Sequence, residues 1–298
     1  MDLKKYVLWT AVITPMQENG EVDYQSFAKV LTEQAAAGNG ILILGSTGEA
    51  LNLNEDERRK ILKFTLEQNL SVPIMVGVGG VNLQETQEWV EHLETMPFSC
   101  YLMVTPLYAK PGPIGQYQWF KKLMDISTKP VVLYNVPSRT GVNLPFETVA
   151  KLRQHKNFFG IKEASGSLED FKKFREIIPD KMLFSGDDAL MPDFSALGAD
   201  GLISVAANVW PKPTHEFVSQ CLNGQLTDPA LWQQAISSLF IAANPIPVKV
   251  LMTALGSLSA AILRPPLTHE DLSDKTPLFT AHNNINDWYQ RNKGKQNV

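Results

Sequence analysis

The stretch FFGIKEASGSLEDFKKFREII, residues 158–178, places a short apolar run before a segment with helical periodicity. The run at 158–161 is typical of a buried strand, and Ser167 is a favoured N-cap for the amphipathic segment that follows. A buried strand and a covering helix form the repeating unit of proteins with a parallel sheet. The strand ends in Lys162, a residue type that is seldom buried without a partner.

Apolar runs of this kind occur eight times, most of them 20–35 residues apart, with helix start signals between them, for example at Asp23 and Asn54. Eight strand–helix units predict a (β/α)8 TIM barrel. A doubly wound open sheet is the alternative, but GVGGVN at 77–82 has Asn82 where a dinucleotide-binding turn needs its third glycine. The runs begin at Tyr6, Gly40, Pro73, Cys100, Pro130, Phe158, Met182 and Asp200.

The alternation stops after about residue 225. Segments 230–244, 247–256 and 267–292 then have helical patterns separated by Pro and Gly signals. We therefore expect residues 1–225 to form the barrel and residues 226–298 to form a helical extension packed on it. The apolar face of the extension could equally serve an oligomer contact.

The composition excludes several classes of protein. A formal charge of −4 without a long Lys/Arg cluster argues against a nucleic-acid binder. No apolar segment reaches the roughly 18 residues that span a bilayer, and Thr10 and Thr14 interrupt the first apolar run, which favours a strand over a signal peptide. Cys100 and Cys221 fit neither a disulfide framework nor a CxxC site, so a reducing cytoplasm is expected.

Catalytic residues of TIM barrels lie on the loops after the strands, and here those loops carry mainly hydroxyl and phenol groups. The five histidines fall within or near helical segments, which argues against an imidazole metal site. Asp187 and Asp188 are expected to cap the following helix and to form local hydrogen bonds. We expect no metal and no cofactor. The strand-end set comprises Thr14, Ser46, Thr47, Glu49, Thr105, Tyr108, Tyr134, Asn135, Arg139, Lys162, Glu163, Asp187, Asp188 and Ser204.

Two interpretations of Lys162 are open. It could extend to solvent with Glu163 as its surface partner, or it could be a Schiff-base lysine whose burial lowers the amine pKa. Amine catalysis also needs proton transfer, for which Tyr134 is the natural candidate. The GSTGE turn at 45–49 could bind a carboxylate through backbone amides near a helix N-terminus, or it could be a tight turn selected for its conformation alone.

Together these residues resemble the dihydrodipicolinate synthase family of pyruvate-dependent Schiff-base lyases and aldolases. The resemblance covers nearly the whole chain, and YNVPSRTG followed by GIKEASG is its most specific part. It implies a metal-free condensation of pyruvate with aspartate 4-semialdehyde in lysine and diaminopimelate biosynthesis, by a homotetramer built as a dimer of dimers. The matching motifs are GSTGEALNL, VTPLY, YNVPSRTG, GIKEASG, SGDD, GLISVAANV and NPIPVK.

The resemblance also implies the roles of individual residues. Lys162 forms the imine with pyruvate and Tyr134 is the proton donor and acceptor. Ser46 and Tyr108 complete a hydroxyl relay, Tyr108 reaching in from a neighbouring subunit. The pyruvate carboxylate binds at Thr47 and the semialdehyde carboxylate at Arg139, while Gly186 and Ile203 line the pocket.

Departures from the family pattern concern regulation and the relay. Ser46 stands where threonine is commoner, which preserves the donor and acceptor. In the pocket where lysine inhibits some family members, Leu107 lacks the aromatic ring and Arg58 adds positive charge, so we expect weak or absent lysine inhibition. The other matching positions are Ala50, Asn82, Glu55 and Thr86.

Two other functions are compatible with part of this pattern. An N-acetylneuraminate lyase or a 2-keto-3-deoxy sugar acid aldolase would share Lys162 and Tyr134, but Arg139 favours a short acidic acceptor. A non-catalytic ligand-binding barrel would be recognised by loss of the lysine or the tyrosine, and both are present.

Overall fold

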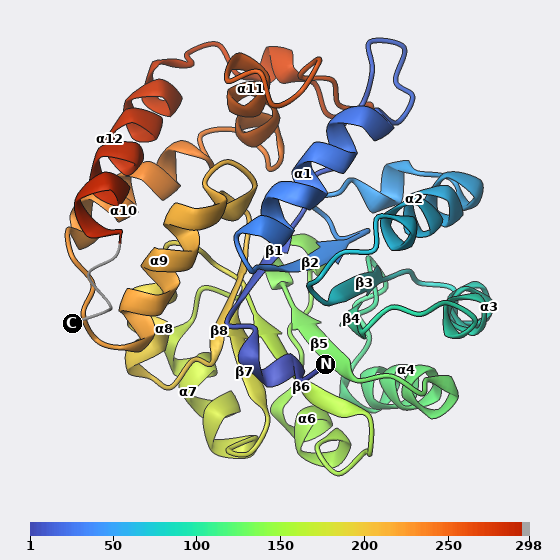
Figure 1. Ribbon diagram of the computed structural model, residues 1–298. Coiled ribbons are helices and arrows are strands. Elements are labelled where there is room, and N and C mark those ends of the chain that lie inside the picture. Colours follow the sequence, from blue (N-terminus) through green and yellow to red (C-terminus); the bar gives the residue numbers. More distant parts are fainter. Residues whose placement is uncertain (294–298) are drawn as a thin grey trace. The chain divides into compact units, whose positions relative to one another are not determined.

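The computed structural model describes residues 1–293. Its strands, labelled in Figure 1, are ordered β1 to β8 in one closed barrel, which confirms the TIM-barrel prediction over the open sheet. The strands are β1 (Leu8–Ala11), β2 (Gly40–Ile43), β3 (Ile74–Val78), β4 (Cys100–Val104), β5 (Val131–Asn135), β6 (Phe158–Glu163), β7 (Met182–Ser185) and β8 (Gly201–Ser204).

Helices follow the strands in the predicted alternation, and the three helix start signals are confirmed. Asp23, Asn54 and Ser167 each accept a hydrogen bond from a backbone N–H in the first turn of the helix that follows, and Asn54 forms a complete capping box. The helices are α1 (Tyr24–Ala36), α2 (Glu55–Glu67), α3 (Leu83–Glu94), α4 (Pro113–Ile126), α5 (Pro137–Thr140), α6 (Phe146–Leu152), α7 (Leu168–Ile177), α8 (Met191–Ala196), α9 (Pro211–Leu222), α10 (Pro229–Ser238), α11 (Ile246–Ala254) and α12 (Thr276–Asn292), with short 3-10 helices η1 (Leu3–Lys5), η2 (Ala50–Asn52), η3 (Ala206–Asn208) and η4 (His269–Asp271).

The chain divides into two compact units. The β3–β8 unit comprises Met1–Lys5 and Pro73–Ile203, and the β1–β2 unit comprises Tyr6–Val72 and Ser204–Val298. The division at residue 225 into a barrel and an extension stays a prediction, because these units have other bounds.

Register in the β3–β8 unit sets the positions of the candidate site residues. Tyr134 on β5 pairs with Lys162 on β6, and Lys162 pairs with Phe184 on β7. A Cβ at Gly160 would lie only 2.1 Å from the Met182 carbonyl oxygen, so glycine permits the close approach of β6 and β7 there. Cys100 on β4 is a free, fully buried thiol.

Tryptophan and phenylalanine rings join the helices of the β1–β2 unit. The Trp232 ring on α10 stacks on Phe217 of α9 at 4.3 Å between centroids and meets Trp288 of α12 edge-on at 5.0 Å. Cys221 on α9 is likewise free and buried. The expected helices at 230–244 and 247–256 are α10 and α11, each shorter than its pattern.

The prediction of one helix over 267–292 was wrong for its first part. That part forms η4 and an irregular segment, and α12 begins only at Thr276. Asp274 accepts a hydrogen bond from the Thr276 N–H, and Pro277 occupies the first turn of α12. Both residues favour a helix start over continuation of an earlier helix. No helix within residues 1–293 combines the length and apolarity needed to cross a bilayer.

Candidate active site

Lys162 is a buried amine near the carboxyl end of β6. The residue is only 5% exposed, and its Nζ lies 4.3 Å from the centroid of the Tyr134 ring. The two residues are register partners on neighbouring strands, which keeps the amine beside the phenol ring. Of the two interpretations of Lys162, the extension to solvent is therefore wrong.

Burial lowers the pKa of Lys162 from 10.5 to about 7, because desolvation penalises the charged amine. The negative charge of Asp188 opposes this shift, and the positive charge of Arg139 adds to it. A large share of the amine is thus neutral near pH 7. The neutral form carries the lone pair that attacks a carbonyl group.

Gly186 leaves room for the lysine side chain. A Cβ at this position would lie 2.9 Å from Lys162 Cε and 2.7 Å from the Cβ of Ala164, closer than unbonded carbon atoms normally approach. The Gly186 N–H donates to the Glu163 carbonyl oxygen at 2.7 Å, which fixes the backbone of this loop beside β6. Glycine at position 186 thus has a steric reason beside Lys162, while its role in lining a substrate pocket stays a prediction.

Glu163 is not the surface partner of Lys162. Successive side chains of a strand point to opposite faces, and the Glu163 carboxylate is fully buried, where it accepts hydrogen bonds from Asn135 Nδ2 at 2.7 Å and from the Ser165 N–H at 2.6 Å. Burial raises the pKa of Glu163, and these hydrogen bonds oppose the shift. Asn135 Oδ1 accepts from the Leu144 N–H at 2.8 Å, so the carboxylate anchors the ends of the loop after β5.

That loop carries Arg139 on the short helix α5. The helix begins at Pro137 and ends at Gly141, whose φ of 72° lies in the left-handed region that glycine favours. Arg139 is exposed, yet it is near enough to influence the pKa of Lys162. The arrangement thus brings an exposed guanidinium close enough to act electrostatically on the buried amine.

Asp188 belongs to the strand-end set, but the sequence interpretation did not assign it an electrostatic effect on Lys162. The expected capping by Asp187 and Asp188 was wrong, because the N-cap of α8 is Leu190, which makes no side-chain cap. The expected local hydrogen bonding is confirmed for Asp187, whose Oδ1 accepts from the Ala189 N–H at 2.9 Å. Asp188 is buried, and its charge acts on Lys162.

Tyr108 is not brought to the lysine within this chain. It is 93% exposed, with a φ of 63° in the loop after β4, and its phenol has no hydrogen-bond partner within residues 1–293. Ile203, by contrast, is fully buried in β8, where the preceding Leu202 pairs with Ser185 of β7. Only its backbone could contribute to a pocket.

The GSTGE turn belongs to the β1–β2 unit. Thr47 is buried and its Oγ1 accepts a hydrogen bond from Asn244 Nδ2 at 2.9 Å, whereas Ser46 is exposed. Thr14 Oγ1 donates to the Gly48 carbonyl oxygen at 2.7 Å. The turn runs directly into the three-residue helix η2, and α2 begins at Glu55 after the predicted start signal Asn54. Carboxylate binding by the turn stays a prediction.

Within residues 1–293 no three His, Cys, Asp or Glu side chains lie together as a metal ion would require. Four of the five histidines lie in helices, and His155 follows α6, where its Nε2 lies 3.3 Å from Asp125 Oδ1. Metal independence stays a prediction.

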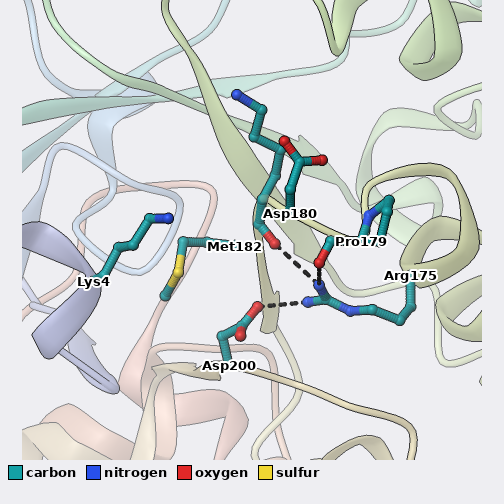
Figure 2. Close-up of a pocket in the computed structure, with 7 residues that line it drawn as sticks. Lys4, Arg175, Pro179, Asp180, Met182 and Asp200 are labelled. Carbon is teal, nitrogen blue, oxygen red and sulfur yellow. Dashed lines mark hydrogen bonds and ion pairs between the residues drawn. The ribbon is translucent and has the colours of Figure 1, made fainter.

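A pocket at the opposite, amino end of β7 holds none of the candidate site residues (Figure 2). Its Arg175 guanidinium donates to Asp200 Oδ2 at 2.5 Å and to the carbonyl oxygens of Ile178, Pro179 and Lys181. The arginine is thus engaged in joining the α7–β7 connection to the start of β8. This pocket is a structural feature, separate from the strand ends that carry Lys162.

Comparison with known proteins gives a consistent result. The model of the Dihydrodipicolinate synthetase family matches residues 5–282. A 4-hydroxy-tetrahydrodipicolinate synthase of Wolbachia pipientis subsp. Culex pipiens (strain wPip) is 45% identical over 287 residues, 96% of this chain and 98% of that protein. The enzyme of the same name from Francisella tularensis subsp. novicida (strain U112) is 44% identical over 95% of this chain and 96% of its own length.

A solved structure is similar over the same extent. The crystal structure of the chloride-inhibited dihydrodipicolinate synthase from Acinetobacter baumannii, complexed with pyruvate, has a TM-score of 0.89 and 32% sequence identity. The match covers 94% of this chain and 99% of that one.

Proposed function

The chain belongs to the dihydrodipicolinate synthetase family, whose members are class I Schiff-base lyases, and from this we propose how its residues catalyse the 4-hydroxy-tetrahydrodipicolinate synthase reaction. The substrates are pyruvate and L-aspartate 4-semialdehyde, and the reaction serves lysine and diaminopimelate biosynthesis. One observation carries the proposal: a buried lysine whose pKa is lowered to about 7 lies with its amine 4.3 Å from a tyrosine ring at a barrel strand end.

In the first half of the proposed reaction the neutral Lys162 amine attacks the C2 carbonyl of pyruvate. Water leaves and a protonated imine remains. The imine withdraws electrons from the C3 methyl group, which loses a proton and becomes a nucleophilic enamine. No cofactor is needed, because the iminium nitrogen itself accepts the electron pair.

In the second half the enamine carbon attacks the aldehyde carbon of the semialdehyde, forming the new carbon–carbon bond. The amino group of the semialdehyde part then attacks the imine carbon, closes the ring and releases Lys162. Both halves move protons on and off oxygen and nitrogen atoms, so a positioned acid–base group is required.

We assign that acid–base role to Tyr134, supported by its position beside the Lys162 amine. Ser46 and Tyr108 complete the relay in this proposal. The exposed phenol of Tyr108, which lacks a partner in its own chain within residues 1–293, suits a contribution to the site of a neighbouring subunit.

Substrate binding is assigned to four residues. Thr47 binds the carboxylate of pyruvate at the GSTGE turn, while Gly186 and the backbone of Ile203 line the pocket. Arg139 binds the carboxylate of the semialdehyde, because a guanidinium can donate two parallel hydrogen bonds to one carboxylate. This preference for an acidic acceptor separates the proposal from a sugar-acid aldolase, which would also use Lys162.

Assembly and location are proposed by the same family resemblance. We propose a homotetramer, a dimer of dimers, in the cytoplasm. The two free and buried cysteines suit a reducing compartment. Light scattering coupled to gel filtration would report four copies of the 33.2 kDa chain if the tetramer is correct.

The function is tested by offering purified protein pyruvate together with either aspartate 4-semialdehyde or N-acetylmannosamine. Turnover of the semialdehyde alone is expected. Turnover of the sugar alone would retain the Schiff base and reject the assignment of Arg139. If neither acceptor is consumed, borohydride reduction in the presence of pyruvate tests the imine directly, and absence of a covalent adduct at Lys162 would reject the catalytic proposal.

A further inference from the structure

A buried ion pair joins the C-terminal helices to the GSTGE turn. Lys249 on α11 and Glu49 at the end of the turn are both almost completely buried, with 2.5 Å between Nζ and Oε1. Lys249 Nζ also donates to the Ile262 carbonyl oxygen at 2.8 Å. Removing two charges from water is expensive, so such a pair is a poor source of net stability and is better understood as a device that fixes one geometry.

The geometry it fixes is unusual. Glu49 has a φ of 55°, in the left-handed region that costs a non-glycine residue about 1 kcal/mol or more. Its backbone N–H donates to the Ser46 carbonyl oxygen at 3.0 Å, which closes the turn. Its second carboxylate oxygen accepts from the Arg264 N–H at 3.2 Å. Contacts from beyond residue 244 thus hold the end of the turn in a conformation that its own sequence does not favour.

A second contact reaches the proposed carboxylate-binding residue itself. Asn244 Nδ2 donates to Thr47 Oγ1 at 2.9 Å, and both side chains are buried. The other amide atom, Asn244 Oδ1, is buried with no partner in the part of the chain that is described. Because Thr47 Oγ1 accepts from Asn244, its hydroxyl proton remains available for another acceptor. No acceptor takes it within residues 1–293.

We propose that Asn244 and Lys249 are positioning residues for pyruvate binding: Asn244 directs the Thr47 hydroxyl proton toward the substrate carboxylate, and the Lys249–Glu49 pair holds the turn that carries it. A carboxylate is an acceptor-only group, so it needs a hydroxyl that donates. The inference rests on the proposed role of Thr47. It gives the segment after residue 225 a function in the active site.

The decisive variant is Asn244→Asp. The new carboxylate can only accept, so it would take the Thr47 proton and leave the hydroxyl oxygen facing the substrate. We expect the KM for pyruvate to rise at least about tenfold, while the kcat at saturating pyruvate falls less than about threefold and the KM for the semialdehyde is unchanged. Asn283→Asp, an exposed position on α12 with the same charge change, is the matched control and should leave all three constants unchanged.

Thr47→Val separates this inference from the proposed function. It removes the hydroxyl, so the pyruvate KM should rise as in Asn244→Asp. The pyruvate KM of the double variant should rise no further, since both changes remove the same interaction. If Thr47→Val raises the KM and Asn244→Asp does not, the inference is overturned and the role of Thr47 stands. If Thr47→Val leaves the KM unchanged, both the role of Thr47 and the inference are rejected.

The ion pair is tested by the neutral double variant Lys249→Met/Glu49→Gln, which avoids leaving one buried charge alone. We expect a higher pyruvate KM with normal borohydride trapping of Lys162 at saturating pyruvate, and circular dichroism is measured to confirm folding. A folded double variant with the wild-type pyruvate KM would overturn the role of the pair. If the double variant does not fold, the pyruvate KM is measured for Glu49→Gln alone, which retains hydrogen-bonding capacity. A wild-type KM in that folded variant would likewise overturn the role of the pair.

Discussion

Replacement of Lys162 by methionine should stabilise the protein while abolishing its activity. Methionine has a similar length and shape but no amine to desolvate. In the folded chain the pKa of Lys162 is about 7, against 10.5 for an unburied lysine. Between these two pH values the unfolded state binds more protons than the folded state, so folding is opposed, and the opposition fades as the pH rises toward 10.5.

The size of the effect follows from the shift. One unit of pKa corresponds to about 1.4 kcal/mol, so the desolvated amine lowers the free energy of unfolding by about 4 kcal/mol at pH 7 and by only about 1 kcal/mol at pH 9.5. Lys162→Met has no such dependence. Its stability advantage over the wild type should therefore shrink by about 3 kcal/mol between pH 7 and pH 9.5.

The measurement is urea unfolding followed by tryptophan fluorescence, at both pH values and at one fixed protein concentration, with reversibility checked. Comparing two pH values cancels any packing difference between lysine and methionine. Lys122→Met, at an exposed position on α4, is the control and should change stability by less than about 0.5 kcal/mol. The reasoning is refuted if the advantage of Lys162→Met stays constant between the two pH values, or if the variant is the less stable protein at pH 7.

The other predictions concern catalysis and regulation. Tyr134→Phe removes the acid–base group, so kcat should fall by about 10²–10⁴-fold, and near-normal turnover would remove Tyr134 from the relay. Gly186→Ala places a Cβ 2.9 Å from Lys162 Cε, so pyruvate-dependent borohydride trapping should slow at least about tenfold, and an unchanged trapping rate would show that the lysine has room to move. Because Leu107 and Arg58 depart from the pattern of lysine-inhibited family members, a lysine titration should give weak or no inhibition. Half-inhibition at a sub-millimolar lysine concentration would contradict this prediction.

The sequence was sufficient where the signal was local or periodic. Ser167 and Asn54 mark helix starts because a short polar side chain can satisfy backbone N–H groups of the first turn, and both positions are caps in the structure. The eight strands were visible because a parallel sheet buries both faces of each strand. Tyr134 pairs with Lys162 because β5 and β6, which carry them, are neighbouring strands of the barrel and lie in register.

What the sequence could not supply were interactions between distant residues. Glu163 bonds to Asn135, 28 residues away, and strand alternation alone would have argued against pairing it with Lys162. Asp188 influences the lysine only because the loop after β7 returns to β6. The contact of Lys249 with Glu49 spans 200 residues, a separation at which no local pattern carries information.

The two buried thiols also have a practical consequence for experiments. Burial raises the pKa of the Cys221 thiol to about 12 and that of Cys100 further still, so both remain protonated and inert toward maleimides at neutral pH. The chain has only these two cysteines. A cysteine introduced at an exposed position such as Lys122 on α4 would therefore be the one reactive thiol on the native protein. Fluorophores attached there could follow subunit exchange in real time, without first removing any natural cysteine.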